Sequence, residues 1–476
     1  MSRAAQDYSP KTRPLEHQVE ATEYIAQSPT AALFDEQGLG KTKIVIDALC
    51  RSMERNEIQG VLVVVPLSLA YNWEQEIVRH SHLLPIVLRG SERERRYKLL
   101  TGANFYITNY EAVVAHLDRM KRFCRSRRVA IVLDEAARIK NPSTKTASAL
   151  FELAPLAAKR IIVTGTPVAN KPVDVWAQYY FLDQGSTLGD DYRSFQADYD
   201  EDSPGYVDRL AELRARISAS SIRRVKSDVL ELPEKVYTVV PVDLEGRQLQ
   251  LYNTLRDELR IEITSLDGSR VVDESDNILK KLLRLVQLAS NPMLVDRSYA
   301  DVPAKFPVVE DLVNTAVSSG DKVIVWTCFV ENVLLLKNRL RALHPLIIHG
   351  GIPVADRAQK VAKFQTEDKN KVLIANPAAA REGLTLTRAN HAVYVDRNFN
   401  LADYLQSQDR IHRISQTKKC IVYKIIANGT VDQYVDRIID FKADVASFQQ
   451  SDSDSIQPKS MDTLFNKQTL LSALGG

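Results

Sequence analysis

The chain has 476 residues, long enough for about two to four domains, and its 45% hydrophobic and 26% charged residues are ordinary for a soluble globular protein. Because 63 Lys and Arg nearly balance 60 Asp and Glu, the net charge of +3 does not indicate a nucleic-acid binder. A basic surface would need local clusters such as residues 119–128 and 223–226, and such runs are more often solvated faces. Four scattered cysteines give no sign of a zinc site or a disulfide framework.

A helix is predicted over residues 15–25, where it opens with the letters LEHQ. Its Gln18 lies just upstream of a glycine-rich segment, and an amide side chain can pair with both the donor and the acceptor edge of adenine. The alternative is a surface glutamine. Position in the chain favours the adenine contact.

The segment 35–42, DEQGLGKT, lies between an apolar run that predicts a buried strand (31–34) and an amphipathic run that predicts a helix (43–53). Its glycines would let backbone N–H groups face phosphate oxygens, while Lys41 reaches the terminal phosphates and Thr42 holds Mg²⁺. Its first position is Asp rather than Gly, so a turn with a solvated lysine is the alternative. The predicted ATP-binding residues are Gln18, Asp35, Glu36, Gln37, Gly38, Leu39, Gly40, Lys41 and Thr42.

Further apolar runs alternate with helical segments, which indicates an α/β domain with right-handed crossovers and ligands beyond the carboxyl ends of its strands. Predicted strands cover residues 60–65, 86–88, 105–109, 129–133 and 160–163, and a helix covers 68–80.

Two adjacent carboxylates, Asp134 and Glu135, follow the most apolar of these strands. Buried carboxylates need a positive partner, and nucleotide-bound Mg²⁺ is a natural one. Asp134 would hold the metal through water, and Glu135 would orient and deprotonate the attacking water. The turn after the strand 160–163 carries Thr164, Gly165 and Thr166, which would relay the phosphate state or serve as a simple loop.

The second half of the chain predicts another α/β lobe, without a phosphate loop. Five strand-like runs are separated by helical segments. They are residues 323–326, 346–348, 371–375, 391–395 and 421–425. Farther along, Gln406, Arg410 and Arg413 would share one helical face. The guanidinium groups of Arg410 and Arg413 could reach a phosphate held by the first lobe, although arginines at this spacing usually form surface salt bridges.

Taken in chain order, twelve segments resemble the successive motifs of the Swi/Snf-type ATPases of helicase superfamily two. They are LEHQ, DEQGLGKT, VVPLSLAYNWEQE, ITNYEAV, VLDEAARIKN, VTGTPVANKPVDVW, SIRRVKSDVLELPEK, LRLVQLASNPMLV, KVIVWTCF, HGG, VLIANPAAAREGLTLT and QSQDRIHRISQ. The resemblance covers residues 15 to 439.

The resemblance implies an α/β fold of two RecA-like lobes, parallel sheets flanked by helices, with helical insertions between them and a C-terminal helical tail. We expect lobe 1 over residues 1–232, with a helical insertion at 171–216, and a linker with a helical protrusion over 233–300. Lobe 2 would then cover 301–445, and a polar tail with a short apolar end would cover 446–476.

It further implies an ATP hydrolase that uses Mg²⁺ and translocates along duplex DNA, gripping phosphates without sequence preference and without separating the strands. The implied catalytic residues are Lys41, Asp134, Glu135, Gln406, Arg410 and Arg413, with Thr42 and Asp134 serving Mg²⁺. The implied DNA contacts are Asn72, Trp73, Asn109, Lys140, Asn141, His349 and Gly350. The implied coupling residues are Thr164, Gly165, Thr166 and Gly383.

Three departures from the family pattern are Ala137 in place of a frequent His, the segment NPAAAREG, which resembles the DNA-annealing and replication-fork branch, and Ser415 in place of a frequent Gly. Two alternatives stay open: a strand-separating or fork-remodelling helicase, and a nucleotide-gated DNA-binding scaffold with little turnover. The expected setting is a bacterial or phage-related defence or repair system with a protein partner for targeting or nuclease activity. No apolar run approaches the ~18 residues of a membrane span, so we expect no membrane partner and a cytoplasmic, nucleoid-associated protein, or a nuclear one if eukaryotic.

Overall fold

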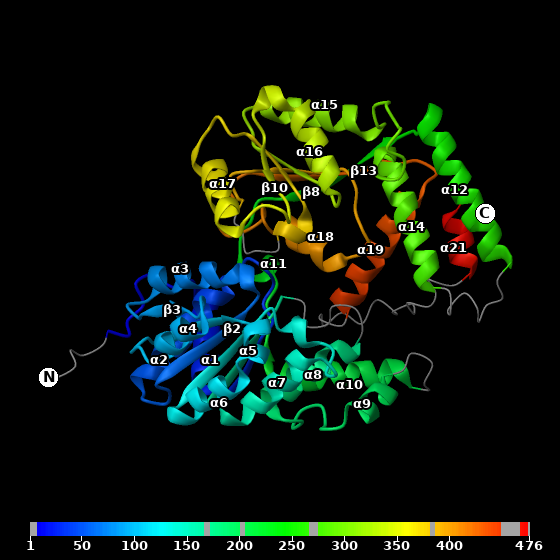
Figure 1. The fold of residues 1–476 in the computed structure, drawn as a ribbon. Coiled ribbons are helices and arrows are strands. Elements are labelled where there is room, and N and C mark those ends of the chain that lie inside the picture. Colours follow the sequence, from blue (N-terminus) through cyan, green and yellow to red (C-terminus); the bar gives the residue numbers. More distant parts are fainter. Residues whose placement is uncertain are drawn as a thin grey trace. The chain divides into compact units, whose positions relative to one another are not determined.

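Two parallel β-sheets carry the fold, and each belongs to one compact unit of the chain, Met1–Glu231 or Leu232–Gly476 (Figure 1). The computed structural model describes residues 7–165, 172–199, 205–265, 275–380, 386–448 and 467–474. Every strand pairing within these ranges is parallel. The predicted α/β class with two RecA-like lobes is therefore confirmed.

The sheet of the first unit has the order β3-β4-β2-β5-β6-β1-β7 among the described residues. Its strands are β1 (Thr30–Leu33), β2 (Gly60–Val65), β3 (Pro85–Val87), β4 (Phe105–Asn109), β5 (Val129–Asp134), β6 (Lys159–Val163) and β7 (Ser221–Ile222). Its helices are α1 (Glu16–Gln27), α2 (Lys41–Glu54), α3 (Ala70–His80), α4 (Glu92–Leu99), α5 (Tyr110–Ala115), α6 (Leu117–Ser126), α7 (Lys145–Leu153), α8 (Trp176–Asp183), α9 (Tyr192–Asp198), α10 (Tyr206–Ala219) and α11 (Lys226–Val229).

Both faces of this sheet are covered, which is why β2 reads as an uninterrupted apolar run. Val61, Val63 and Val65 pack with α1, α2 and α3 on one face. Leu62 and Val64 pack on the other face with α5, α6, α7 and α8. The alternation of side chains along each strand therefore divides the core of the unit into two layers.

The sheet of the second unit has the order β10-β11-β9-β12-β13-β8 among the described residues. Its strands are β8 (Lys235–Val242), β9 (Val323–Trp326), β10 (Leu346–Ile348), β11 (Val372–Ala375), β12 (His391–Tyr394) and β13 (Cys420–Ala427). Its helices are α12 (Gly246–Ser265), α14 (Ser275–Ser290), α15 (Lys305–Ser318), α16 (Val330–Arg339), α17 (Val354–Thr366), α18 (Leu401–Gln408), α19 (Val431–Phe448) and α21 (Lys467–Ala473).

This second sheet is also covered on both faces. Val323 and Val325 of β9 pack with α15 and α16. Ile324 and Trp326 of the same strand pack in the cluster that contains α12, α14, α19 and α21. The C-terminal helix α21 thus docks on the second unit, since its Leu470 is buried in that cluster.

The insertion predicted over residues 171–216 is helical in its described parts, and its helix α8 belongs to the core of the first unit. Trp176, Tyr179 and Phe181 of α8 are buried in the same cluster as the adjacent face of the first sheet. The aromatic side chains of α8 therefore complete that face of the core. Within the described ranges, the helices do not include one with the length and hydropathy that a membrane span requires.

Candidate active site

The phosphate loop leads from β1 into α2 through two glycines that adopt left-handed backbone conformations. Gly38 has φ of 94° and Gly40 has φ of 82°, a region that other residues enter only at a cost. A Cβ at Gly40 would also collide with Nε2 of Gln18. Gly40 precedes the first turn of a 14-residue helix, and the N–H groups of such a turn attract anions. This backbone fits the phosphates of a nucleotide.

Lys41 folds back onto the loop that precedes it. Its Nζ donates to the carbonyl oxygen of Asp35 at 2.8 Å and to that of Glu36 at 3.3 Å. The same ammonium lies close to the turn after β6, because a Cβ at Gly165 would lie 3.4 Å from Nζ. Lys41 is therefore placed among loop carbonyls, and its binding of phosphate oxygens stays a prediction.

The turn after β6 closes over the phosphate loop. A Cβ at Gly165 would lie 2.8 Å from Cγ of Gln37, so a larger residue there would require that side chain to shift. Thr164 is fully buried, and its backbone N–H donates to the carbonyl of Leu33 at 3.1 Å. This contact suits residues expected to relay the phosphate state. Thr166 and Gly383, the other predicted coupling residues, lie outside the described residues.

Gln18 packs against the loop in this structure. Its Nε2 donates to the carbonyl of Leu39 at 3.1 Å, and Nε2 of His17 lies 3.1 Å from the same oxygen. Oε1 of Gln18 accepts from the N–H of Leu15 at 3.0 Å, within the same helix start. Gln18 is buried rather than a surface glutamine, and its role in reading adenine stays a prediction.

Asp134 and Glu135 end β5 in a conformation that the surrounding side chains hold. Oδ2 of Asp134 accepts from Nε1 of Trp73 at 2.7 Å, and its backbone carbonyl accepts from the hydroxyl of Tyr110 at 2.8 Å. Glu135 has φ of 54°, a strained conformation for this residue type and one that clusters at functional sites. Burial raises the pKa of Asp134, while the Trp73 hydrogen bond and the Lys41 charge oppose that rise. Asp134 thus lies within electrostatic range of Lys41 at one edge of the sheet, and its carboxylate suits a hydrated divalent cation.

The prediction that Trp73 contacts DNA directly is wrong for this structure. Its side chain has no exposed surface, and its indole N–H donates to Oδ2 of Asp134. Its neighbour Asn72 is half-buried on α3. The sequence placed both residues on one helix, but it could not show that the indole packs in the core and donates to Asp134.

The other predicted DNA contacts lie on loops or at the ends of strands, partly open to solvent. Asn109 donates to Glu111 at 2.6 Å, Lys140 pairs with Asp174 at 3.8 Å, and Asn141 accepts from the N–H of Ser143 at 2.9 Å. In the second unit, Nδ1 of His349 accepts from the N–H of Gly351 at 3.2 Å, and the carbonyl of Gly350 accepts from Arg357 at 3.0 Å. Their contacts with DNA stay predictions.

The basic cluster 223–226 is not a solvated face. The side chain of Arg224 is one-tenth exposed, and its Nη2 pairs with Oδ2 of Asp35 at 2.6 Å. Lys226 is buried, and its Nζ lies 3.4 Å from Oε1 of Glu36. These two cations were missed as site residues. The adjacent carboxylates that open the phosphate loop were the available signal, because a fully buried Asp35 requires a positive partner.

The predicted helical face of Gln406, Arg410 and Arg413 is also wrong. Helix α18 ends at Gln408, so both arginines follow it in a turn region. Arg410 is 2% exposed, and its carbonyl accepts from the N–H of Leu386 at 2.9 Å. Nε of Arg413 donates to the carbonyl of Asp409 at 2.7 Å. The regular spacing did not reveal the end of the helix, and the arginine-finger role stays a prediction.

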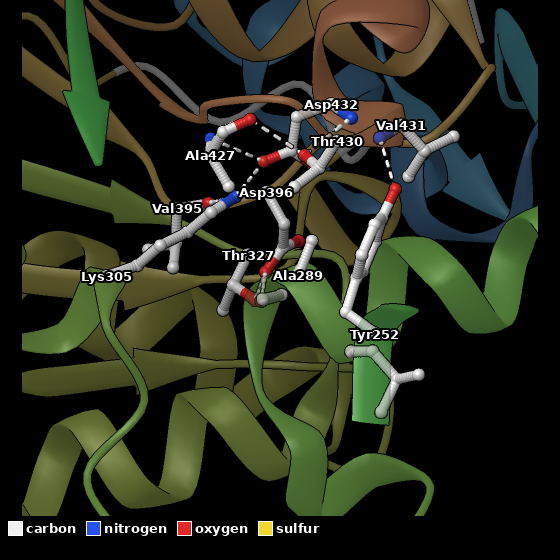
Figure 2. A network of polar contacts seen from close by, with 12 residues as sticks. Tyr252, Ala289, Lys305, Thr327, Val395, Asp396, Ala427, Thr430, Val431 and Asp432 are labelled. Carbon is white, nitrogen blue, oxygen red and sulfur yellow. Dashed lines mark hydrogen bonds and ion pairs between the residues drawn. The ribbon is translucent and has the colours of Figure 1, made fainter. Parts of the chain in front are cut away.

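In the second unit, the carboxyl edge of the sheet carries a different carboxylate, Asp396, which follows β12 and is 2% exposed (Figure 2). Its Oδ2 accepts from the hydroxyls of Ser290 and Thr327, each at 2.7 Å, and from Nδ2 of Asn332 at 3.2 Å. Its Oδ1 accepts from the N–H of Cys328 at 2.6 Å. Both carboxylate oxygens are therefore satisfied from within the protein.

A second buried charge pair lies beside this network. Lys305 of α15 has no exposed surface, and its Nζ binds the carbonyl of Val395 and a carboxylate oxygen of Asp432 (Figure 2). The N–H of Val431 donates to the hydroxyl of Tyr252 at 2.7 Å. These contacts connect α12, α15 and α19 to the end of β12, and no sequence pattern predicts them.

Comparisons with known proteins give consistent matches over the chain. A model of the SNF2-related domain matches residues 17–294, and a model of the helicase conserved C-terminal domain matches residues 304–415. An uncharacterized ATP-dependent helicase of Mycoplasma pneumoniae is 29% identical over 428 residues, 87% of this chain and 40% of that protein. The ISWI chromatin-remodeling complex ATPase ISW1 of Saccharomyces cerevisiae is 27% identical over 429 residues, 85% of this chain and 37% of that protein. The chain thus spans less than half the length of these relatives.

Among solved structures, the SWI2/SNF2 ATPase core of Sulfolobus solfataricus in complex with dsDNA is 28% identical, with 94% of this chain and 96% of that chain covered and a TM-score of 0.45. The family assignment rests on the SNF2-related match, which covers more than half of the 476 residues. The chain belongs to the SNF2-related family.

Proposed function

We propose that this chain is an ATP-dependent translocase on double-stranded DNA, which couples ATP hydrolysis to movement along the duplex without separating its strands. The observation that carries the proposal is the meeting of Lys41, Asp134 and Gly165 at one edge of the first sheet. A Cβ at Gly165 would lie 3.4 Å from the Lys41 ammonium, and burial raises the pKa of Asp134 while the charge of that ammonium opposes the rise. In a member of the SNF2-related family, these residues suit hydrolysis of a nucleoside triphosphate.

The chemistry follows from the groups on this edge. Lys41 leaves the carbonyls of Asp35 and Glu36 and neutralises the terminal phosphates. Thr42 and Asp134 hold Mg²⁺, which supplies positive charge against the transferred phosphoryl group. Glu135, projected by its left-handed backbone, orients the attacking water and accepts its proton.

The second unit contributes Gln406, Arg410 and Arg413 in this proposal. A guanidinium that reaches the terminal phosphate stabilises spreading negative charge, so hydrolysis depends on closure of one lobe on the other. Duplex DNA is held through its phosphates by Asn72, Asn109, Lys140, Asn141, His349 and Gly350, and binding falls with salt concentration.

The experiment that tests translocation is displacement of a third strand from a triplex that flanks a duplex track, with unwinding of a forked duplex measured in parallel. ATP-dependent triplex displacement without duplex unwinding is the expected result. Unwinding of the fork would favour the strand-separating helicase instead. ATP-dependent binding with neither displacement nor turnover would favour a nucleotide-gated scaffold.

We propose further that the chain is the motor of a bacterial or phage-related defence or DNA repair system. Its match to an ATP-dependent helicase of Mycoplasma pneumoniae supports a bacterial setting. The test is affinity purification from the native host at low salt after nuclease treatment. Recovery of a nuclease or a targeting protein is expected, and recovery of the chain alone would contradict this setting.

A further inference from the structure

A short segment that precedes the second unit runs along the phosphate loop of the first. We call residues 221–229 the clamp segment; it comprises β7 and α11 and ends just before Leu232, where the second unit begins. Strand β7 pairs in parallel with β1. The pairing continues past the strand, because Phe34 N–H donates to the carbonyl of Ile222 and Glu36 N–H to that of Arg224, each at 2.9 Å. The clamp segment therefore follows the chain into the phosphate loop.

Two cations of the clamp segment, the largely enclosed Arg224 and the buried Lys226, bind the two carboxylates that open the loop. Arg224 binds both oxygens of Asp35, with Nε at 3.1 Å from Oδ1 and Nη2 at 2.6 Å from Oδ2. Its remaining nitrogen, Nη1, donates to the carbonyl of His17. Lys226 binds Glu36 through its backbone N–H at 2.7 Å and through its ammonium. A guanidinium with this planar fork fixes direction as well as distance.

This arrangement explains why the loop begins with Asp rather than Gly. The Asp35 carboxylate has no exposed surface, and the ion pair with Arg224 compensates the cost of burying its charge. Removing one partner of such a pair leaves an uncompensated buried charge. Asp35, the residue that departs from the strict phosphate-loop pattern, thus pairs with an arginine 189 positions farther along the chain.

The same two loop residues carry the resting contacts of Lys41. Its ammonium binds the carbonyls of Asp35 and Glu36, whereas the clamp segment binds their side chains. When Lys41 moves to a phosphate, these carbonyls lose a donor. The position of the loop then depends on its contacts with Arg224 and Lys226. A change in the bound nucleotide therefore changes these contacts.

We propose that Arg224 and Lys226 are positioning residues that hold the phosphate loop ready for nucleotide and pass its nucleotide state to the chain entering the second unit. The inference rests on the proposed function, because it requires that the loop bind a nucleotide. It goes beyond that function by assigning a transmitting role to the clamp segment.

The first test needs no variant. Hydrogen–deuterium exchange of the whole chain is measured with and without MgADP at a concentration that saturates the site. We expect MgADP to change exchange in peptides from residues 221–235 as well as in the loop at 35–42. A change confined to the loop would overturn the inference while leaving the proposed function intact. Absence of MgADP binding would overturn both.

The second test is Arg224→Lys, which keeps the positive charge but cannot bind both Asp35 oxygens and the His17 carbonyl at once. We expect its MgADP dissociation constant to rise about tenfold and the nucleotide effect on residues 221–235 to disappear. A variant that folds, binds MgADP like the parent chain and retains that effect would overturn the inference.

The matched control is Lys159→Gln in the same unit. Lys159 is also a buried cation, and its Nζ donates to the carbonyls of Ile25 and Ala26 at the opposite end of the sheet. This variant should lower the melting temperature while leaving the MgADP dissociation constant unchanged. A tenfold weakening in the control as well would overturn the inference, because general destabilisation would then explain the Arg224 effect.

Discussion

The carboxyl edges of the two sheets carry carboxylates in different surroundings, half-buried Asp134 in the first unit and buried Asp396 in the second. In the first unit, Asp134 receives the indole N–H of Trp73 and the backbone N–H of Glu135, and its neighbour Glu135 is held at φ of 54°. In the second unit, Asp396 receives four hydrogen bonds from side chains and backbone and is almost fully enclosed. Asp134 has two donors and a neighbour with a left-handed backbone, whereas Asp396 has four donors from within the protein.

This difference indicates that the first edge serves nucleotide chemistry, whereas the second edge stabilises the fold of its own lobe. The raised pKa of Asp134 and the left-handed backbone of Glu135 reduce stability unless a ligand compensates for them. A satisfied network such as that of Asp396 instead fixes the arrangement of the helices around it. Variants at the first edge should therefore alter nucleotide chemistry, whereas variants at the second should alter folding.

Glu135→Gln should have the largest effect, because it removes the base that accepts the proton of the attacking water. We expect the rate of ATP hydrolysis to fall by about 10²- to 10⁴-fold while MgADP binding persists. Steady-state hydrolysis and a binding isotherm would measure the two quantities. Glu92→Gln, at an exposed helix start, is the control and should retain full turnover. Unchanged turnover in Glu135→Gln would remove the catalytic assignment.

Asp396→Asn should act on the opposite edge by breaking the satisfied network. An amide cannot accept from all four donors, so at least one buried donor loses its partner, at a cost of about 2 to 4 kcal/mol. Thermal unfolding should show the loss, while MgADP affinity at low temperature should be unchanged. Asp368→Asn, whose side chain is exposed, controls for the charge change. A stable variant with weakened nucleotide binding would contradict the division between the edges.

Trp73→Phe should affect the first edge more mildly. It keeps most of the buried ring but removes the N–H that holds Asp134, so we expect about a tenfold fall in kcat/KM for ATP. Trp176→Phe is the matched control, since that indole is also buried but its Nε1 has no hydrogen-bond partner within the described residues. Equal effects of the two substitutions on kcat/KM would show that packing alone is responsible.

The smallest expected effect is at Asp321, which lies before β9, away from the Asp396 edge. Burial raises its pKa, but hydrogen bonds from Lys418, Asn390 and His391 more than offset this, so its pKa lies below the ordinary value of 3.8. Its stabilising contribution is therefore present above that value and is lost as pH falls through the lowered pKa. Urea unfolding from pH 6 down to about 3.5 should show a shallower acid loss in Asp321→Asn, by about 1 kcal/mol or less. Identical slopes would contradict the role of these hydrogen bonds.

Sequence patterns were sufficient for elements whose signal is local. The runs at 105–109, 323–326 and 346–348 coincide with β4, β9 and β10, because fully buried parallel strands are continuous apolar runs. Strands β7 and β8 were missed. β7 has two residues, and β8 alternates in exposure at the edge of its sheet, so neither forms a continuous apolar run.

Contacts between distant segments were beyond the sequence. The type and order of residues predicted Lys41, Asp134 and Glu135, but not the partner of Asp35, which lies 189 positions away. Helical spacing misled at Arg410 and Arg413, because α18 ends earlier than the pattern. Burial of Trp73 and satisfaction of Asp396 depend on which side chains meet in three dimensions, and periodicity carries no such information.

The most direct test of the account is steady-state ATP hydrolysis without nucleic acid and with single-stranded DNA, duplex DNA, forked DNA or RNA, each at low and moderate salt. The account predicts that duplex DNA raises the rate most and that this stimulation weakens as salt increases, because the contacts are made to phosphates. Absence of hydrolysis under all conditions would contradict the proposal that the first unit hydrolyses ATP. Hydrolysis at a rate that no nucleic acid changes would contradict the proposal that DNA controls it.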